Sequence, residues 1–342
     1  MRGIHKSDVI IFQDGNLEAI SKIGKKHGIE TIQNVQKVHL RGRLMDGAAR
    51  IAQHYKFSLS MVFKMRPSAP ACIIVEDDLL FSPDFFDYFR GIAPLIDKDP
   101  TVFIASAWND NGFTEKVRDI HGLRRTEFFP GLGWLLSREL YIGELESSWP
   151  TEHWDHWLRS DSVSKGREIV YPQVPRSFHN GVIGTFMNVE THNKYFKDIA
   201  YNRNVDVVWS TRAYLQGVGD VYEQRIKELI DQCIHVESVN DLSSGRGIGK
   251  VHCAWINVNP DPSFNGFQEF EQVGKFFGLW HEHQRGVHRG VHEFYWKNRY
   301  VLILNIFESA SRRDGEVYEG PAKNYKSLMP SSARVIARSE FM

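Results

Sequence analysis

The spacing of apolar residues changes repeatedly along the first third of the chain, which predicts alternating strands and helices. Residues 9–12 form an apolar run followed by a polar turn at 13–15, as expected for a buried strand. Residues 47–64 give the strongest helical pattern, and residues 32–40 suggest a further strand. The apolar positions with helical spacing are Leu17, Ile20 and Ile23 in the first helix and Ile51, Tyr55, Leu59 and Val62 in the second.

A second strand–helix–strand unit follows. Residues 73–75 form a short apolar strand that ends in Glu76-Asp77-Asp78. Ser82 and Pro83 then predict the N-cap and first turn of a helix that runs from Asp84 to about Ile96. Residues 101–107 read as another buried strand. This alternation predicts an α/β fold with a largely parallel sheet in the first half of the chain.

The pattern changes near residue 205, where we place a domain boundary. Helical spacing over 219–233 is followed by strands near 249–257 and by a hairpin over 291–307. The last residues lack periodicity and predict a loose tail. The expected organisation is therefore a catalytic domain over 1–205, a smaller α+β domain over 206–310, and a tail over 311–342.

Charge and cysteine content exclude several classes of protein. Lys+Arg and Asp+Glu both number 42, so the formal net charge is zero and a nucleic-acid partner is not expected. The 3 cysteines cannot build a disulfide framework, and Cys72 lies in an apolar run where we expect it to be buried and inert. No apolar stretch is long enough to span a membrane.

The acidic run Glu76-Asp77-Asp78 is the first candidate for chemistry. Ligands of open α/β sheets bind beyond the carboxyl ends of strands, where this run lies. Three adjacent carboxylates repel one another unless a cation is present, so a hard divalent cation that also holds a diphosphate is one interpretation. A solvated turn that caps the next helix is the other.

Two aromatic segments are further candidates. A carboxylate flanked by indoles, such as Asp155 between Trp154 and Trp157, is shielded from water and could act as a general base beside a sugar. A tryptophan core with an incidental surface Asp is the alternative. The run Phe128–Trp134 contains two glycines and suits either a loop lining a donor pocket or a tight turn into a helix over 137–145.

Four histidines near the C-terminus suggest a zinc site at first sight. Their spacing completes no standard zinc pattern, because no Cys, Asp or Glu supplies the remaining ligand. We therefore expect a solvated or hydrogen-bonded surface rather than a metal centre. The four are His281, His283, His288 and His292.

These segments occur together in one order, and that order resembles a known family. The segments are Val75–Asp78, Pro83–Phe86, Ser106–Gly112, Phe128–Trp134, Trp149-Pro150 and Trp154-Asp155. The series is similar to the β-1,2-N-acetylglucosaminyltransferases that act on mannose, in N-glycan maturation or on protein O-mannose. The resemblance is dense over about residues 47–200 and diffuse to about 307.

The resemblance implies a GT-A fold, with a nucleotide-sugar-binding sheet covered by helices on both faces and a smaller C-terminal α+β domain. It implies UDP-N-acetylglucosamine as donor, Mn²⁺ as cofactor, a mannose-bearing glycoprotein glycan as acceptor, and inversion at the anomeric carbon. Carried over by motif, Asp78 is the metal ligand and Asp155 the catalytic base. The donor-contacting positions are Asp14, His54, Glu76, Asp77, Leu132, Trp154 and, in the loop 180–184, Val182.

The sequence also departs from the family pattern. Family members begin the catalytic domain with one more strand, which carries a donor-contacting arginine, and we find no counterpart here. The membrane anchor that would place the enzyme in the Golgi lumen as a type II protein is likewise not in this sequence. Ile104 and Ile169 stand where the family commonly has a disulfide, so packing is expected to replace the bond. His156 follows Asp155 where the N-glycan enzyme has a second Asp, which could alter acceptor contacts.

The choice of acceptor stays open from sequence. Segments through Asp155 are closer to the N-glycan enzyme, whereas Arg176–His179 and 181–188 are closer to the O-mannose enzyme. We favour an N-glycan acceptor. A shortened, inactive sugar-binding relative and a metal-dependent phosphohydrolase remain the competing hypotheses.

Overall fold

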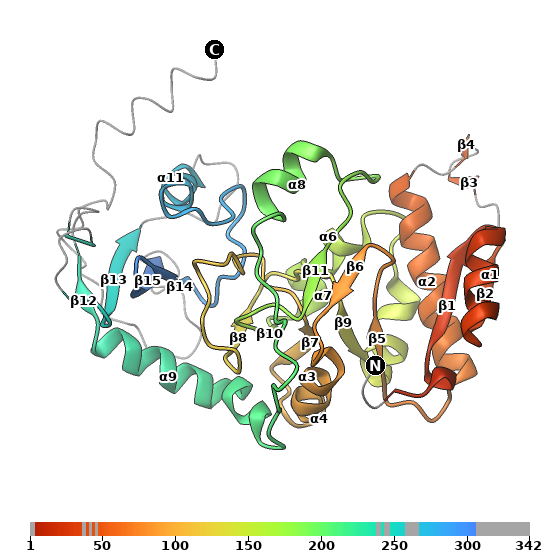
Figure 1. The fold of residues 1–342 in the computed structure, drawn as a ribbon, viewed down its shortest axis with the longest axis horizontal. Helices are drawn as coiled ribbons and strands as arrows, with labels where there is room; N and C mark the ends of the chain where they lie inside the picture. Colours follow the sequence, from red (N-terminus) through yellow and green to blue (C-terminus); the bar gives the residue numbers. More distant parts are fainter. Residues whose placement is uncertain are drawn as a thin grey trace, which may run out of the picture.

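The computed structural model describes residues 4–35, 39–40, 43–44, 47–236, 241–242, 247–256 and 267–305. Within them, a 5-stranded sheet occupies the first half of the chain and a 4-stranded sheet the second. Figure 1 shows the 4-stranded sheet at the left end of the molecule and the 5-stranded sheet in the middle, with α9 running below the 4-stranded sheet. The predicted tail over 311–342 lies outside the described residues, and the boundary near 205 stays a prediction.

The central sheet has the strand order β5-β9-β7-β10-β8. Only β7 and β10 pair in parallel, so the expected largely parallel sheet is wrong. The sequence pattern missed β8, β9 and β10. β9 lies between β5 and β7 and runs antiparallel to both, whereas β8 is an edge strand that runs antiparallel to β10. The bounds are β5 Ala71–Ile74, β7 Val102–Ser106, β8 Leu123–Thr126, β9 Trp134–Ser137 and β10 Glu168–Pro172.

Successive side chains of these strands enter two different cores, because strand side chains alternate between faces. Ile104 of β7 and Ile169 of β10 lie in one core with α2, whereas Ala105 and Val170 lie in the other with α3. Helices therefore cover both faces of the sheet. Ile104 and Ile169 are register partners and fully buried, which confirms the expected packing contact between them.

The N-terminal residues form a separate layer. β1 (Ile10–Asp14) and β2 (Glu30–Asn34) pair in parallel, with α1 (Glu18–His27) between them in the chain. The strand expected over 32–40 therefore ends at Asn34, before the described pair β3 (His39–Leu40) and β4 (Arg43–Leu44). In Figure 1, α2 (Gly47–Met65) lies between this layer and the central sheet.

The helix expected from Asp84 to Ile96 is divided. α3 (Phe85–Ile92) and α4 (Pro94–Lys98) meet at Ala93, because Pro94 has no N–H to continue the helical hydrogen bonds. Asp84, rather than the predicted Ser82, occupies the N-cap position of α3. The Asp84 carboxylate is buried and accepts hydrogen bonds from Arg176, Asn202 and Trp209, so it joins three segments of the chain.

The remaining described elements of the first part of the chain are short. β6 (Leu79–Phe81) pairs with β11 (Ser177–His179). The other helices are η1 (Lys6–Asp8), α5 (Arg138–Leu140), the π-helical η2 (Tyr141–Leu145), η3 (Glu146–Ser148), α6 (Trp154–Leu158), α7 (Asp161–Ser164), α8 (Val189–Tyr195) and η4 (Ala213–Gly217). No helix among the described residues combines the length and apolar character that crossing a membrane requires.

The second sheet has the order β12-β13-β15-β14. The predicted hairpin is confirmed over the described residues as β14 (Val291–Trp296) and β15 (Arg299–Asn305), and the predicted helix as α9 (Gly219–Asp231). β12 (Ile234–His235), β13 (Val251–Ile256) and α11 (Phe267–Phe277) complete this half.

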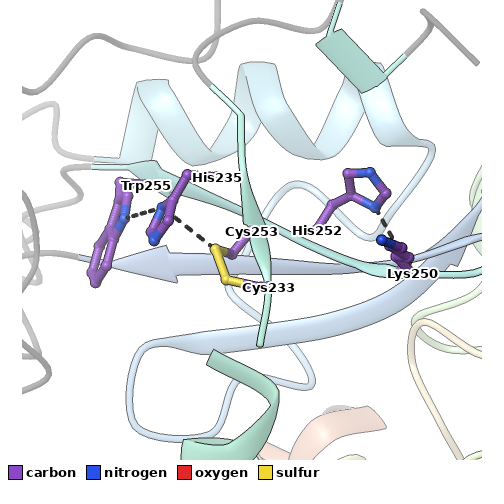
Figure 2. The surroundings of a disulfide bond; sticks show 6 residues. All are labelled: Cys233, His235, Lys250, His252, Cys253 and Trp255. Carbon is purple, nitrogen blue, oxygen red and sulfur yellow. Dashed lines mark hydrogen bonds between the residues drawn. A yellow bond between two sulfur atoms is a disulfide. The ribbon is translucent and has the colours of Figure 1, made fainter. Parts of the chain in front are cut away.

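A disulfide joins the end of α9 to β13. Cys233 and Cys253 are bonded, with their Cα atoms 5.7 Å apart, and Figure 2 shows the bond beside His235. Our expectation that the three cysteines build no disulfide framework thus missed a single bridge, because no local pattern indicates that two residues 20 positions apart meet. Cys72 is a free thiol, and burial raises its pKa to about 12, which agrees with an inert residue.

Buried ion pairs join the two halves of the chain. The Glu293 carboxylate on β14 lies between Arg225 of α9 and Arg124 of β8. His288 contacts Glu168 of β10 through Nδ1, and its Nε2 lies 2.8 Å from Glu223 of α9. Charges from the central sheet, α9 and the second sheet therefore meet at one internal boundary.

Candidate active site

The helix α2 carries His54 and contacts three other predicted site residues, Asp14, Glu76 and Trp154. Near its start, Arg50 forms an ion pair with Asp14 at the end of β1, at 2.8 Å between Nη2 and Oδ2. One turn later, His54 lies close enough to Asp14 for the charge of that carboxylate to affect its pKa, and it contacts the carbonyl of Phe12. Burial lowers the pKa of His54, although Asp14 and the Phe12 contact oppose the shift. Asp14 and His54 thus lie together, and their role in binding the donor stays a prediction.

The next residue on α2, Tyr55, connects two candidate motifs. Its hydroxyl donates a hydrogen bond to Oε1 of Glu76 in the acidic turn. Its ring stacks on the Trp154 indole with the ring centroids 4.0 Å apart. Burial raises the pKa of Glu76, as do the charges of Asp78 and Asp77, while the Tyr55 hydrogen bond opposes the rise. One tyrosine therefore holds the acidic turn beside the segment that carries Asp155.

Asp78 lies at the end of the acidic turn, against the loop that follows β11. Its Oδ2 is 3.1 Å from Nε2 of His179, and its backbone carbonyl accepts a 2.8 Å hydrogen bond from the N–H of Asn180. The hydrogen bond from His179 lowers the pKa of Asp78. Oδ1 is buried and accepts no hydrogen bond from any described residue. Asp77, by contrast, points to solvent.

The tryptophan cluster is both a core and a support for the site. Trp154 is buried and stacks on Trp134 and Trp149, with centroid distances of 5.7 and 6.1 Å. Asp155, the next residue, has 34% of its side chain exposed and binds Arg159 at 2.8 Å through Oδ2. His156 lies 4.0 Å from the same oxygen. The indoles therefore fix the start of α6 while the carboxylate reaches the surface.

The glycine-rich segment adopts a conformation that the sequence only partly predicts. Gly131, Leu132 and Gly133 are all left-handed, with φ of 70°, 54° and 91°. This is unusual for Leu132 and is held by its surroundings, because Ser177 donates to the Leu132 carbonyl at 2.6 Å. The segment leads into β9 rather than directly into a helix. It brings Leu132 next to Ser177 of β11. The same strand ends at His179, which contacts Asp78.

Val182 belongs to a segment with no regular structure between β11 and α8. Several apolar side chains there are exposed, and Ile183 and Phe186 are 84% and 67% accessible. The segment reaches both α2 and α6. A β-carbon at Gly47 would lie 2.5 Å from a methyl of Thr185, and the Phe186 ring centroid is 6.4 Å from that of His153. It therefore borders the same region as Asp78 and Asp155.

The chemistry of the acidic turn fits a divalent cation. A buried carboxylate oxygen without a protein partner is costly, and a hard cation is a suitable partner for it. Asp78 Oδ1 meets this description, and Glu76 and Asp77 add negative charge nearby. No sequence pattern indicated that Tyr55 links the two motifs or that His179 is a neighbour of Asp78. The helical period indicated only that Tyr55 was buried.

Two other groups of possible metal ligands do not form such a site. The C-terminal histidines do not converge on one point. We expected them at the surface, but His288 and His292 are buried. His288 is paired with carboxylates, and His292 stacks on Phe270. The ligand atoms of Cys233, His235 and Cys253 lie within 4.8 Å of one another. However, the two sulfurs are bonded to each other, so they offer no thiolates (Figure 2).

Comparisons with known proteins agree on one relationship. Residues 4–304 match the family model described as "GNT-I family". The chain is also 32% identical over 290 residues to the alpha-1,3-mannosyl-glycoprotein 2-beta-N-acetylglucosaminyltransferase of Arabidopsis thaliana. That match covers 83% of this chain and 62% of the plant protein, so the chain spans less than two thirds of its relative's length.

Proposed function

The chain belongs to the GNT-I family, and from that premise we propose that it transfers N-acetylglucosamine from UDP-N-acetylglucosamine to a mannose-bearing glycan of a glycoprotein. The proposed reaction joins the sugar to the 2-hydroxyl of α-mannose with inversion at the anomeric carbon. The fold would be of the GT-A type with a smaller C-terminal domain. The name of the plant relative supports the donor sugar and the mannosyl acceptor.

The observation that carries this proposal is the position of Tyr55. It contacts Glu76 through its hydroxyl and Trp154 through its ring, so the acidic turn and the Asp155 segment share one buried side chain. A diphosphate bound near the acids and a hydroxyl activated by Asp155 would then be neighbours. Such positioning of two reactants supplies a large share of catalysis in group transfer.

The donor side of the site consists of the acidic turn and the residues along α2. Asp78 would hold Mn²⁺, with Glu76 and Asp77 supporting it. When bound, this cation neutralises the diphosphate and stabilises UDP as the leaving group. Asp14 and His54 would bind the nucleoside, and Leu132 and Val182 would border the sugar. The exposed segment around Val182 would close over the donor and exclude water.

Asp155 is the proposed general base. Arg159 holds its Oδ2 at 2.8 Å, and Arg159 is itself anchored by a 3.0 Å hydrogen bond to the Phe129 carbonyl. Asp155 would accept the proton of the mannose 2-hydroxyl as that oxygen attacks the anomeric carbon. Trp154 fixes the start of α6 and so the direction of the carboxylate. One displacement is enough, and no enzyme-bound sugar is formed.

We propose an N-glycan acceptor, in agreement with the name of the plant relative. A protein O-mannose acceptor is the second candidate, since Arg176–His179 and residues 181–188 resemble that branch of the family. Both reactions belong to protein glycosylation, and we propose the lumenal side of the Golgi membrane as the location.

A transfer assay tests the proposal. The chain is incubated with UDP-N-acetylglucosamine and Mn²⁺, with a mannose-terminated N-glycan and an O-mannosyl peptide as parallel acceptors. Product on one acceptor, lost on chelation, is expected and identifies the substrate. Asp155→Ala should lower the transfer rate about 10²–10⁴-fold while UDP binding is retained, as for loss of a general base. Asp161→Ala, which removes an exposed acid from α7, is the matched control.

Three results would contradict the proposal. Full activity of Asp155→Ala rules out its role as the base. Sugar binding without transfer by the folded protein favours the inactive relative. Hydrolysis of phosphoesters in the absence of any sugar acceptor favours the phosphohydrolase hypothesis.

A further inference from the structure

The two oxygens of the Asp78 carboxylate have different surroundings. Oδ2 lies 3.1 Å from Nε2 of His179, whereas Oδ1 is buried and accepts no hydrogen bond from any described residue. A carboxylate with one oxygen held by a donor cannot rotate without breaking that bond. The contact with His179 therefore decides which oxygen is presented to the site, and in which direction.

The backbone delivers His179 to this position. β6 and β11 pair antiparallel with His179 opposite Leu79, the residue that follows Asp78. The N–H of Asn180 donates to the Asp78 carbonyl at 2.8 Å, which fixes the turn from the other side. A β-carbon at Gly181, in the loop after β11, would lie 2.6 Å from Asp78 Oδ2, so a side chain there would displace the carboxylate from its present position.

The imidazole is held on its other side as well. The His179 ring lies over the Phe196 ring with the centroids 5.0 Å apart, and the His179 residue is only 6% exposed. His192 of α8 stacks on the same phenylalanine, with the centroids 6.4 Å apart, and has no recorded contact with a site carboxylate. The two histidines thus share an aromatic partner, but only His179 reaches the acidic turn. Variants at the two positions therefore distinguish the effect of ring packing on Phe196 from the effect of the contact with Asp78.

We propose that His179 is a positioning residue that holds Asp78 Oδ2 so that Oδ1 faces the divalent cation of the donor complex. The inference rests on the proposed function, since it assigns that cation to Asp78. His179 does not touch the cation or either substrate and acts through Asp78 alone. Outer partners of this kind commonly change metal affinity about 10–100-fold when removed.

The test measures Mn²⁺ binding directly. Free Mn²⁺ is followed by electron paramagnetic resonance during titration of the full chain in the presence of UDP. His179→Phe keeps a ring on Phe196 but removes the N–H, and we expect it to raise the Mn²⁺ dissociation constant about 10–100-fold. His179→Gln can donate from its amide at a similar reach, and it should restore most of the affinity. His192→Phe is the control and should bind Mn²⁺ as the unchanged chain does.

Thermal unfolding of all variants accompanies the titration and separates positioning from folding. Equal loss of affinity in His179→Phe and His179→Gln, or a loss that follows the unfolding temperature, overturns the proposal. So does unchanged Mn²⁺ binding by His179→Phe, and if that variant still transfers sugar, the proposed function stands without His179. Failure of the unchanged chain both to bind Mn²⁺ with UDP and to transfer sugar overturns both proposals.

Discussion

Two clusters of carboxylates in this protein have opposite surroundings. In the cluster around Glu293, both carboxylate oxygens have protein partners: Arg225 binds them at 2.8 and 3.0 Å, and the hydroxyls of Tyr222 and Tyr300 each donate to one. In the acidic turn, three consecutive acids share one histidine and one tyrosine, and Asp78 Oδ1 is left without a described partner.

The comparison distinguishes a charge that stabilises the fold, at Glu293, from charges that we propose to bind a ligand, in the acidic turn. Arg225 and Arg124 hold the pKa of Glu293 far below its usual range despite burial, so the charge is fully compensated within the protein. The acidic turn is not compensated in this way, since burial and the charges of Asp78 and Asp77 raise the pKa of Glu76. Under the proposed function, a cation from outside would supply the missing compensation and hold the diphosphate of the donor.

Removing the Glu293 carboxylate should have the largest effect on stability. Glu293→Ala leaves the buried Arg124 and the partly exposed Arg225 without their acid, and loss of one partner from a buried pair costs about 3–5 kcal/mol. Denaturant unfolding followed by circular dichroism measures the change. Glu18→Ala, which breaks an exposed pair with Lys22, should change it by less than about 0.5 kcal/mol. Equal effects of the two variants would contradict the compensated-charge interpretation.

Opening the Cys233–Cys253 bond should have the next largest effect. The bond closes a loop with a sequence separation of 20 residues, for which chain entropy corresponds to about 3 kcal/mol of stability. The double variant Cys233→Ala/Cys253→Ala is compared with the unchanged chain in thermal unfolding, with and without a reductant. The reductant should destabilise only the unchanged chain. Sugar transfer below the unfolding temperature should survive, because the bond lies in the second half of the chain.

Asp78→Asn should show the reverse pattern. We expect a loss of transfer of at least about 100-fold, equivalent to about 2.7 kcal/mol, because the amide is a poor ligand for the cation. The free energy of unfolding should fall only slightly, because the substitution relieves repulsion with Glu76 but weakens the contact with His179 that lowers the pKa of Asp78. Parallel assays of transfer and denaturant unfolding measure both. Asp87→Asn, in a partly exposed pair with Arg90 outside the acidic turn, is the control. A large loss of stability in Asp78→Asn would mean that the acidic turn, like Glu293, mainly stabilises the fold, and would contradict this expectation.

The smallest expected effect is a pH dependence at the boundary between the two halves. Burial lowers the pKa of His288, but Glu168 and Glu223 outweigh it and raise the pKa from 6.5 to about 9. The stabilisation is therefore complete below pH 6.5 and is lost as the pH rises towards 9, by at most about 1.4 kcal/mol per pH unit. Arg125, Arg289 and the Tyr222 ring complete the surroundings of this ion-pair cluster.

The measurement is the free energy of unfolding between pH 6.5 and 9 for the unchanged chain and for His288→Gln. The variant should be less stable at pH 6.5 and should show a shallower decline, since it cannot lose this proton. Identical slopes would mean that His288 is not protonated in the folded protein.

Local pattern accounts for much of the fold. The helical period over 47–64 predicted α2 nearly to the residue, and apolar runs located β1, β5 and β7. It failed where distant contacts decide the outcome. β8 and β9 became strands because they fill places in a sheet whose other members lie far along the chain. Pro94 was visible in the sequence, but the resulting division of α3 from α4 was overlooked.

The sequence by itself determined which chemical groups are available: an acidic turn after a strand, a carboxylate beside indoles, and an ordered series of motifs typical of one family. Only the tertiary structure decided which groups meet. It joined Glu76 and Trp154 through Tyr55, placed His179 on Asp78, and bonded Cys233 to Cys253. The reason is physical, since side-chain periodicity is a local property of the chain. The disulfide, the pairing of β6 with β11 and the stacking on α2 instead bring together residues about 20 to 100 positions apart.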